Sequence, residues 1–398
     1  MRDNASGIIF FMEKNRTDHL KALDGARGVA ALLIVFYHIG GVVGGGEWFS
    51  GAFLAVDFFF LLSGFVVARS YEQRLRQGSM SLRSFIWTRI IRLYPLYIAA
   101  SMVGFAYFCI KLSMKMPDAP TVRQLIDEIT YSLALIPHPA AVPWGFTEFP
   151  FAPTAWSLSF EFWFGILYAL LLPRLSTRAL TMVAIAGLCV LIKEAYSHGS
   201  LDMGFNRATA LGGAARFWFS FTLGVIMNRM NYRIRPMSSR ALWIGLPVFS
   251  FAILPHNSVT AGFFWIIVVF PLALGAGASI KSRGRVELAL DHLGRLSYAI
   301  YIFHGSMILF AGAFIKRLFA GPLDDHRGKM AVITVAATLA VSAIATYLYD
   351  EPLRRRLKRG LRRNSPLIQV NSALSTAHSA TGLPTAPDRP AAPRRSRH

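Results

Sequence analysis

Ten stretches of apolar residues, each long enough to cross a lipid bilayer, recur along this chain of 398 residues. They lie at about residues 27–44, 51–68, 88–110, 155–172, 179–193, 209–228, 241–255, 259–280, 296–315 and 330–349. A transmembrane helix needs about 20 apolar residues. Soluble domains are about 25% charged, whereas this chain is only 16% charged. We therefore predict an all-α, polytopic integral membrane protein with about ten transmembrane helices.

The distribution of lysine and arginine between alternate segments predicts the topology. The segments before the first span and after every second span hold 32 of these basic residues, and the opposite segments hold 10. Basic residues near span ends stay in the cytoplasm, so both termini are predicted to be cytoplasmic. Membrane lipid then accounts for the net charge of +21. The composition lacks the polar surface of a nucleic-acid binder, so no nucleic-acid partner is expected.

Three parts of the chain follow from this topology. Residues 1–20 are expected to form a cytoplasmic N-terminal segment, because their apolar core is too short and too charged for a cleaved signal peptide. Residues 21–355 form the predicted transmembrane domain. Residues 356–398 are basic at first and then rich in Pro, Ala, Ser and Thr, which predicts a disordered cytoplasmic tail. The two cysteines have no zinc-ligand spacing, so neither a disulfide framework nor a metal site is expected.

The first apolar stretch, LDGARGVAALLIVFYHIGG, carries three ionisable residues on one helix face. His38 follows Arg27 by eleven positions, close to three whole turns, and Asp24 lies within about 40° of the same face. His38 would then lie about 16 Å beyond Arg27, near the middle of a hydrocarbon core of ~30 Å. An imidazole at this depth serves either catalysis or a structural hydrogen bond to a neighbouring helix.

Two carboxylates are predicted at the same depth as His38. Asp57 in the second stretch and Glu161 in the fourth each lie eleven residues, or about 16 Å, from the cytoplasmic end of their span. A carboxylate beside an imidazole raises its basicity and fixes its tautomer, as a general base for a hydroxyl requires. We therefore expect Asp57 and Glu161 to assist His38. Structural carboxylates at helix interfaces are the alternative.

A pair of arginines begins the third stretch, in SLRSFIWTRIIRLYPLY. Arg89 and Arg92 are three residues apart and hence on one helix face, just inside the membrane. Arginine binds phosphate bidentately and stays charged when partly desolvated, so the pair is typical of an oligophosphate site. Positive-inside anchors that extend toward the membrane surface are the alternative.

The ninth stretch, LGRLSYAIYIFHGSMILF, places Ser297, Tyr301 and His304 along one helix face. These side chains could line the same cavity as His38 and Asp24. Equally, serine and tyrosine could simply pack between helices.

Six motifs of this chain resemble the acyltransferase-3 family of membrane proteins, which modify sugars, lipids and macrolides with acyl groups. The motifs are LDGARGVAALLIVFYH, VDFFFLLSGFV, TRIIRLYPLY, WSLSFEFWF, LGRLSYAIYIFH and the DEP that closes the tenth span. Together they cover about residues 20–355 in the order that the family has them.

This resemblance implies transfer of an acyl group, usually acetyl from cytosolic acetyl-CoA, to an acceptor hydroxyl, for instance of a cell-surface or exported polysaccharide. By the resemblance, His38 is the catalytic histidine, Arg27 its partner in the motif, and Arg89 with Arg92 the contacts for acyl-CoA phosphates. Acyl-CoA is then a co-substrate, and no cofactor is expected to stay bound. The expected location is the bacterial inner (plasma) membrane.

Some family members carry a fused extracytoplasmic hydrolase domain of the SGNH type, which is not expected in this chain. Either the membrane domain completes the transfer alone, or a separate extracytoplasmic partner receives the acyl group. A lipid or macrolide acceptor is an alternative, as is a transporter of a lipid-linked saccharide. Internal repeats of about 20–50 residues and matching broken spans are not visible, which disfavours the transporter.

Overall fold

The computed structural model describes residues 21–42, 49–139, 142, 144–145, 147–234, 258–279, 285–318 and 323–363. Every regular element within these ranges is helical, which confirms the all-α prediction. The chain divides into two compact units, Met1–Glu351 and Pro352–His398, close to the predicted end of the transmembrane domain at residue 355. The predicted N-terminal segment and the tail beyond residue 363 lie outside the described residues.

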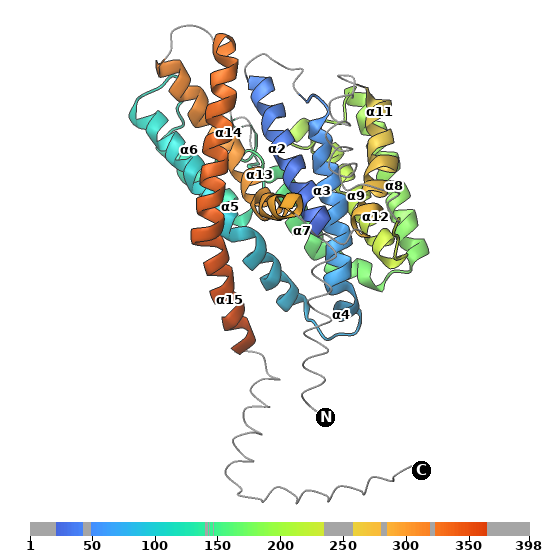
Figure 1. Cartoon of the computed structure of the whole chain (residues 1–398). Helices are drawn as coiled ribbons and strands as arrows, with labels where there is room; N and C mark the ends of the chain where they lie inside the picture. The colour runs from blue at the N-terminus through green and yellow to red at the C-terminus, as the bar shows by residue number, and fades with distance from the viewer. Residues whose placement is uncertain are drawn as a thin grey trace, which may run out of the picture. The chain divides into compact units, whose positions relative to one another are not determined.

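The α-helices follow the predicted spans in order (Figure 1). Their bounds are α2 Lys21–Val42, α3 Ala55–Val67, α4 Gln73–Arg76, α5 Leu82–Ser113, α6 Val122–Ala134, α7 Ala155–Leu171, α8 Thr177–His198, α9 Ala210–Arg229, α11 Val259–Phe264, α12 Phe270–Gly277, α13 Arg285–Leu318, α14 Arg327–Ile344 and α15 Glu351–Arg363. Within the described residues, eight helical segments are long and apolar enough to cross a membrane, and α7 is a shorter apolar helix. The predicted span at 241–255 lies outside the described residues.

Several of these helices begin at a serine whose hydroxyl caps the first turn. Ser81, Ser176 and Ser258 each accept a hydrogen bond from the backbone amide three residues later. Such a cap satisfies one of the four amides that a helix start leaves without an intrahelical partner. The caps explain where α5, α8 and α11 begin: α8 and α11 start within two residues of their apolar stretches, and α5 starts six residues before its stretch.

Helices α2 and α13 run parallel and pack closely along their first halves. Gly25 faces Leu290, and Gly28 faces Leu293. In return, Gly294 on α13 faces the backbone of Asp24 on α2. A Cβ at any of these glycines would overlap its neighbour, so small residues are what allow the two backbones to approach.

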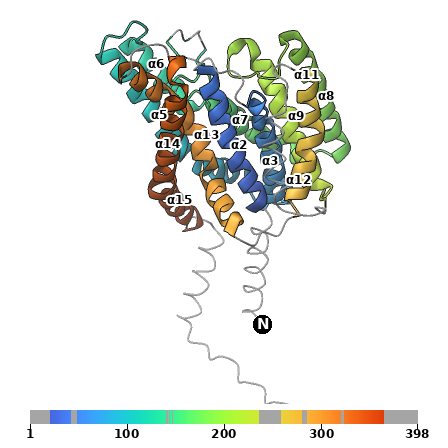
Figure 2. The same cartoon turned by 45° about the horizontal axis from the view of Figure 1, so that its top comes forward.

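Helices α3 and α9 form a second closely packed pair, again through glycines at the contact. Gly64 on α3 lies against the backbone of Phe221, and Gly224 on α9 lies against the carbonyl of Leu61. Figures 1 and 2 show α2 between α13 and α3, with α5, α6 and α14 on one side of the bundle and α8, α9 and α11 on the other. The two glycine-packed pairs are therefore neighbours at the centre of the first unit.

The amphipathic helix α6 lies in the predicted outer segment and buries a carboxyl group. The side chain of Glu128 is buried and accepts a hydrogen bond from Ser132 at 2.9 Å, while the Ser132 carbonyl accepts one from Tyr97 at 2.6 Å. The second oxygen of Glu128, Oε2, has no hydrogen-bond partner among the described residues. Burial raises the pKa of Glu128 to about 7, although the hydrogen bond from Ser132 acts in the opposite direction.

Candidate active site

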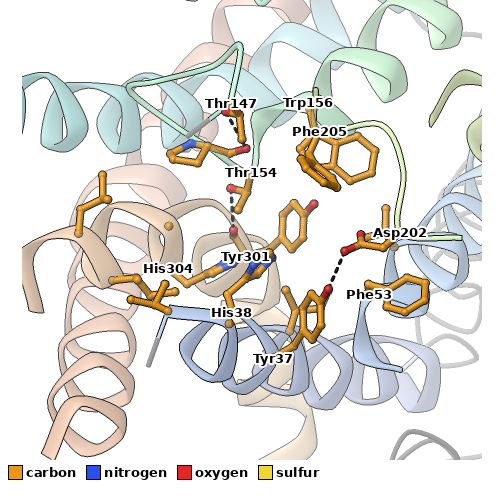
Figure 3. Close-up of a pocket in the computed structure, with 18 residues that line it drawn as sticks. Tyr37, His38, Phe53, Thr147, Thr154, Trp156, Asp202, Phe205, Tyr301 and His304 are labelled. Atoms are coloured by element: carbon orange, nitrogen blue, oxygen red, sulfur yellow. Dashed lines mark hydrogen bonds between the residues drawn. The ribbon is translucent and has the colours of Figure 1, made fainter. Parts of the chain in front are cut away.

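A cavity of about 380 Å³ lies between α2, α3 and α13, at the end of the bundle that is predicted to face away from the cytoplasm (Figure 3). Its polar lining consists of Tyr37, His38, Thr147, Thr154, Asp202, Tyr301 and His304. Its apolar lining includes Ile34, Phe53, Val56, Trp156, Phe205, Ile308 and Leu309. A largely apolar cavity with a few converging polar groups is the usual form of a small-molecule site.

The imidazoles of His38 and His304 stack against each other in this cavity. Their ring centroids are 5.1 Å apart at an interplanar angle of 27°. His38 is accessible from the cavity, whereas His304 is fully buried. Nδ1 of His304 lies 3.3 Å from the carbonyl of Ile300, and its Nε2 has no hydrogen-bond partner among the described residues. His38 is thus the imidazole that a bound molecule can reach.

The carboxylate that lines the cavity with His38 is Asp202, not Asp57 or Glu161. Tyr37, the residue before His38 on α2, donates a hydrogen bond of 2.6 Å to Oδ2 of Asp202 (Figure 3). Asp202 is half-buried, in the short segment between α8 and α9. Asp202 lies outside every predicted span, so it is not among the ionisable residues within spans that the sequence marks as candidates.

Tyr301 connects α13 to the start of α7. Its hydroxyl lies 2.7 Å from that of Ser157, and its backbone carbonyl accepts a hydrogen bond of 3.0 Å from Thr154. The ring of Tyr301 also meets His304 edge to face at 5.8 Å between centroids. Tyr301 and His304 therefore share the His38 cavity, as the spacing on the ninth stretch allows, while Ser297 does not line it.

Asp57 forms a fully buried ion pair with Arg216 on α9. The two side chains are 0% exposed, and Nη2 of Arg216 lies 2.7 Å from Oδ2 of Asp57. The same guanidinium donates to the carbonyls of Met203 at 2.8 Å and Phe53 at 3.0 Å. These bonds fix two segments of the cavity wall to α9: the turn that carries Phe53 and the connection that carries Asp202 and Met203. The sequence signal for this pair is an arginine inside the apolar stretch at 209–228.

Glu161 is held by Arg89 and Ser63 rather than by His38. Nη2 of Arg89 lies 2.5 Å from Oε1 of Glu161, and the hydroxyl of Ser63 donates to the same oxygen at 2.8 Å. The side chain of Arg89 is 1% exposed, whereas that of Arg92 is half-buried. The structure thus brings together Glu161 and Arg89, which the sequence assigns to separate roles.

Arg27 belongs to a polar cluster between α2 and α13, apart from the cavity lining. Its Nε donates to the Ser297 hydroxyl at 2.7 Å, and its Nη2 donates to the carbonyl of Gly294 at 3.1 Å. Asp24 pairs with the same guanidinium at 3.2 Å. Asp24 and Arg27 therefore lie apart from His38, although all three are predicted on one face of α2. Arg27 meets Gly294 and Ser297 near the start of α13, whereas His38 meets His304 further along the same helix.

The cavity offers an accessible imidazole, a second imidazole stacked on it, and a tyrosine bonded to a carboxylate. Such groups can take a proton from a hydroxyl and return it to a leaving group. Within the described ranges, no group of three or more His, Cys, Asp or Glu side chains could hold a metal ion.

Comparison with known proteins points to the same chemistry. A profile of the acyltransferase-3 family, described as an acyltransferase domain, matches residues 20–350. The protein named "Protein 2 in picA locus" of Rhizobium radiobacter is 35% identical over 165 residues, which cover 40% of this chain and 85% of that protein. The O-acetyltransferase OatA of Staphylococcus aureus strain NCTC 8325 is 23% identical over 371 residues, which cover 85% of this chain.

The chain spans only 58% of the length of the staphylococcal enzyme. No solved structure matches this chain. The family profile nevertheless covers most of the chain and includes the helices that carry His38, Asp57, Arg89, Glu161 and His304. The chain is an integral membrane protein that belongs to the acyltransferase-3 family.

Proposed function

We propose that the protein is a membrane O-acyltransferase, which transfers an acyl group from cytosolic acyl-CoA to a hydroxyl of a carbohydrate. Its membership in the acyltransferase-3 family and its similarity to a staphylococcal O-acetyltransferase support this activity. The single observation that carries the proposal is the accessible imidazole of His38 in a cavity that also holds Tyr37, Asp202 and His304. Acetyl-CoA is the proposed donor, and the bacterial inner membrane is the proposed location.

The proposed reaction is a direct transfer with His38 as general base. The acceptor oxygen attacks the carbonyl carbon of the thioester while Nδ1 or Nε2 of His38 takes the hydroxyl proton. A C–O bond forms, the C–S bond breaks, and the imidazolium returns the proton to the CoA thiolate. The thioester is already activated, so general-base catalysis of about 10²–10⁴-fold, together with orientation of the two substrates, is enough. A transient acyl-histidine is the two-step alternative.

A carbohydrate acceptor suits the lining of the cavity. The rings of Phe53, Trp156 and Phe205 offer flat apolar faces, and Asp202 with Thr154 offers hydrogen-bond partners. A sugar ring presents the same combination, since its C–H faces are apolar and its edges carry hydroxyls. If the purified protein does not complete the transfer alone, a separate extracytoplasmic partner receives the acyl group.

Acyl transfer by the purified protein tests the proposed function. Wild-type protein in nanodiscs is incubated with acetyl-CoA and with polysaccharide from cells that lack the protein. We expect release of free CoA, and mass spectrometry should find new acetyl esters on the polysaccharide. The His38→Ala variant should give neither. Wild-type protein that consumes no acetyl-CoA but moves lipid-linked saccharide between vesicle leaflets would make the protein a transporter.

A further inference from the structure

The lining of the His38 cavity has a net negative charge. Among the residues that line it in the described part of the chain, Asp202 is the one carboxylate, and lysine and arginine do not occur. His38 begins the proposed reaction unprotonated, since it acts as the general base. His304 is fully buried and stacked on His38, where a charge without an ion pair would be costly. The carboxylate of Asp202 therefore dominates the charge that a bound molecule meets.

The guanidinium of Arg216, behind the cavity wall, does not offset this charge. It is 0% exposed and pairs with Asp57 at 2.7 Å, so these two buried charges balance each other. The rings of Phe53 and Trp156 line the cavity, and their centroids lie 5.9 and 5.7 Å from the central carbon of the guanidinium. A molecule in the cavity thus meets aromatic rings at this wall rather than a cation.

Asp202 is fixed in place by bonds on both sides of it along the chain. Its backbone amide donates to the hydroxyl of Ser200 at 3.0 Å, and the carbonyl of Met203 accepts from Arg216 at 2.8 Å. Its Oδ2 accepts a hydrogen bond of 2.6 Å from Tyr37, and Figure 3 shows these two side chains directed toward each other. The half-buried carboxylate is therefore held beside the space that an acceptor would occupy.

A carboxylate held in this way distinguishes acceptors by their charge. Like charges a few ångströms apart repel strongly where protein replaces much of the water around them, and most of this lining is apolar. A neutral sugar meets no such repulsion, and its hydroxyls can donate hydrogen bonds to the carboxylate. An acidic sugar would bring a second negative charge into a cavity whose described lining holds no cation to receive it.

We propose that Asp202 makes the His38 cavity selective for acceptor sugars without a negative charge, so that a neutral sugar is acylated in preference to a uronic acid or a phosphorylated sugar. This inference rests on the proposed function, because it specifies the acceptor of the same reaction. Asp202 is then a specificity-determining residue as well as the partner of Tyr37.

Three forms of one polysaccharide test this assignment. The first is the polysaccharide from cells that lack the protein, the second has its primary hydroxyls oxidised to carboxylates, and the third is the oxidised form after methyl esterification. The esterified form is neutral again, so it controls for the loss of the primary hydroxyls. Each modified form is measured as an acceptor of acetyl groups from acetyl-CoA and as an inhibitor of transfer to the unmodified form.

The measurements use wild type, Asp202→Asn and Asp127→Asn in nanodiscs, at low and at high salt. Asp127 is the matched control, because it is an exposed carboxylate on α6 that does not line the cavity. In wild type, we expect the acidic form to have a kcat/KM about tenfold lower, or an inhibition constant about tenfold higher, than the esterified form. This difference should shrink at high salt, because salt screens the repulsion.

Asp202→Asn should bring the acidic and esterified forms within twofold of each other, whatever its effect on the overall rate, and Asp127→Asn should keep the wild-type preference. Equal values for the two forms in wild type, or an unchanged preference in Asp202→Asn, overturn the assignment. A preference that is the same at low and high salt also overturns it, because exclusion is then steric. A wild type that transfers acetyl to none of the three forms contradicts the proposed function itself.

Discussion

His38 on α2 and His304 on α13, far apart in the sequence, stack with their ring centroids 5.1 Å apart. Two imidazoles at this distance repel each other when both are protonated, so a proton taken up by one is disfavoured on the other. His38 faces the cavity, and His304 is fully buried behind it. In the proposed reaction, this arrangement favours His38 as the proton acceptor and His304 as a positioning residue.

Replacement of the two histidines should therefore have unequal effects. His38→Ala should lower kcat by about 10²–10⁴-fold, because it removes the proposed general base. His304→Gln should lower kcat less and leave the KM for acyl-CoA unchanged, because it only alters the support of the His38 ring. Acyl transfer is measured with purified variants whose thermal unfolding matches wild type. A His38→Ala protein with wild-type transfer would show that the base lies elsewhere.

The hydrogen bond between Tyr37 and Asp202 offers a second prediction. Asp202→Asn removes the charge and leaves a side chain of nearly the same size, so the fold should persist. We expect kcat/KM to fall about tenfold, as for the loss of a charge-assisted hydrogen bond, and Tyr37→Phe should cause a similar loss. A double variant no worse than either single variant confirms that the two residues act together. Additive losses contradict this coupling.

The Asp57–Arg216 pair is expected to act on stability rather than on chemistry. Arg216→Met or Asp57→Leu alone leaves an uncompensated buried charge, which costs about 3–5 kcal/mol. The double replacement Asp57→Leu with Arg216→Met should recover most of this loss, because two apolar side chains can replace a buried pair. Thermal unfolding in detergent measures the difference. An Asp57→Asn protein of wild-type stability and no activity would instead support a catalytic Asp57.

Glu128 predicts how stability depends on pH. Its pKa is raised from 4.5 to about 7 in the folded protein, so the folded state binds the proton more tightly than the unfolded state. The contribution of Glu128 to stability should therefore be fully present below pH 4.5 and fall as the pH rises to 7, by on the order of 3 kcal/mol. Glu128→Gln should remove this dependence and raise the melting temperature at pH 8 but not at pH 4. Asp127→Asn, at an exposed neighbour, is the control.

Reporter fusions test the predicted topology and, with it, the side on which the His38 cavity lies. The basic-residue count predicts that reporters fused after positions 47 and 257 are extracytoplasmic and that those after positions 77 and 235 are cytoplasmic. The opposite pattern would place the end of the α3–α4 segment near Gln77 outside the cell and contradict the predicted cytoplasmic termini.

The elements and the helix faces of this protein are predictable from sequence because both depend on local patterns. Apolar length locates the spans, and the eleven-residue spacing places Arg27 and His38 on one face of α2. The spacing on α13 likewise places Tyr301 and His304 together. In the structure these two faces meet, and His38 and His304 line one cavity.

The choice of ionic partners is not predictable in this way. Equal depth suggests that Asp57 and Glu161 serve His38, but each is bound by an arginine from another helix. Which charges pair depends on the rotation and packing of whole helices, and a depth estimate does not contain that information. Asp202 lies in a short connection, where apolar periodicity carries no signal.

The glycine contacts of α2 with α13 and of α3 with α9 have a consequence for how the cavity changes width. Backbones that touch through glycines cannot slide without collision, so each pair behaves as one rigid body. The His38 cavity has α2 and α13 on one side and α3 with its preceding turn on another, and the segments around the start of α7 and between α8 and α9 complete its lining. A rocking motion of one pair against the other would change the width between α2 and α3, while His38 and His304, within one pair, would keep their stacking throughout.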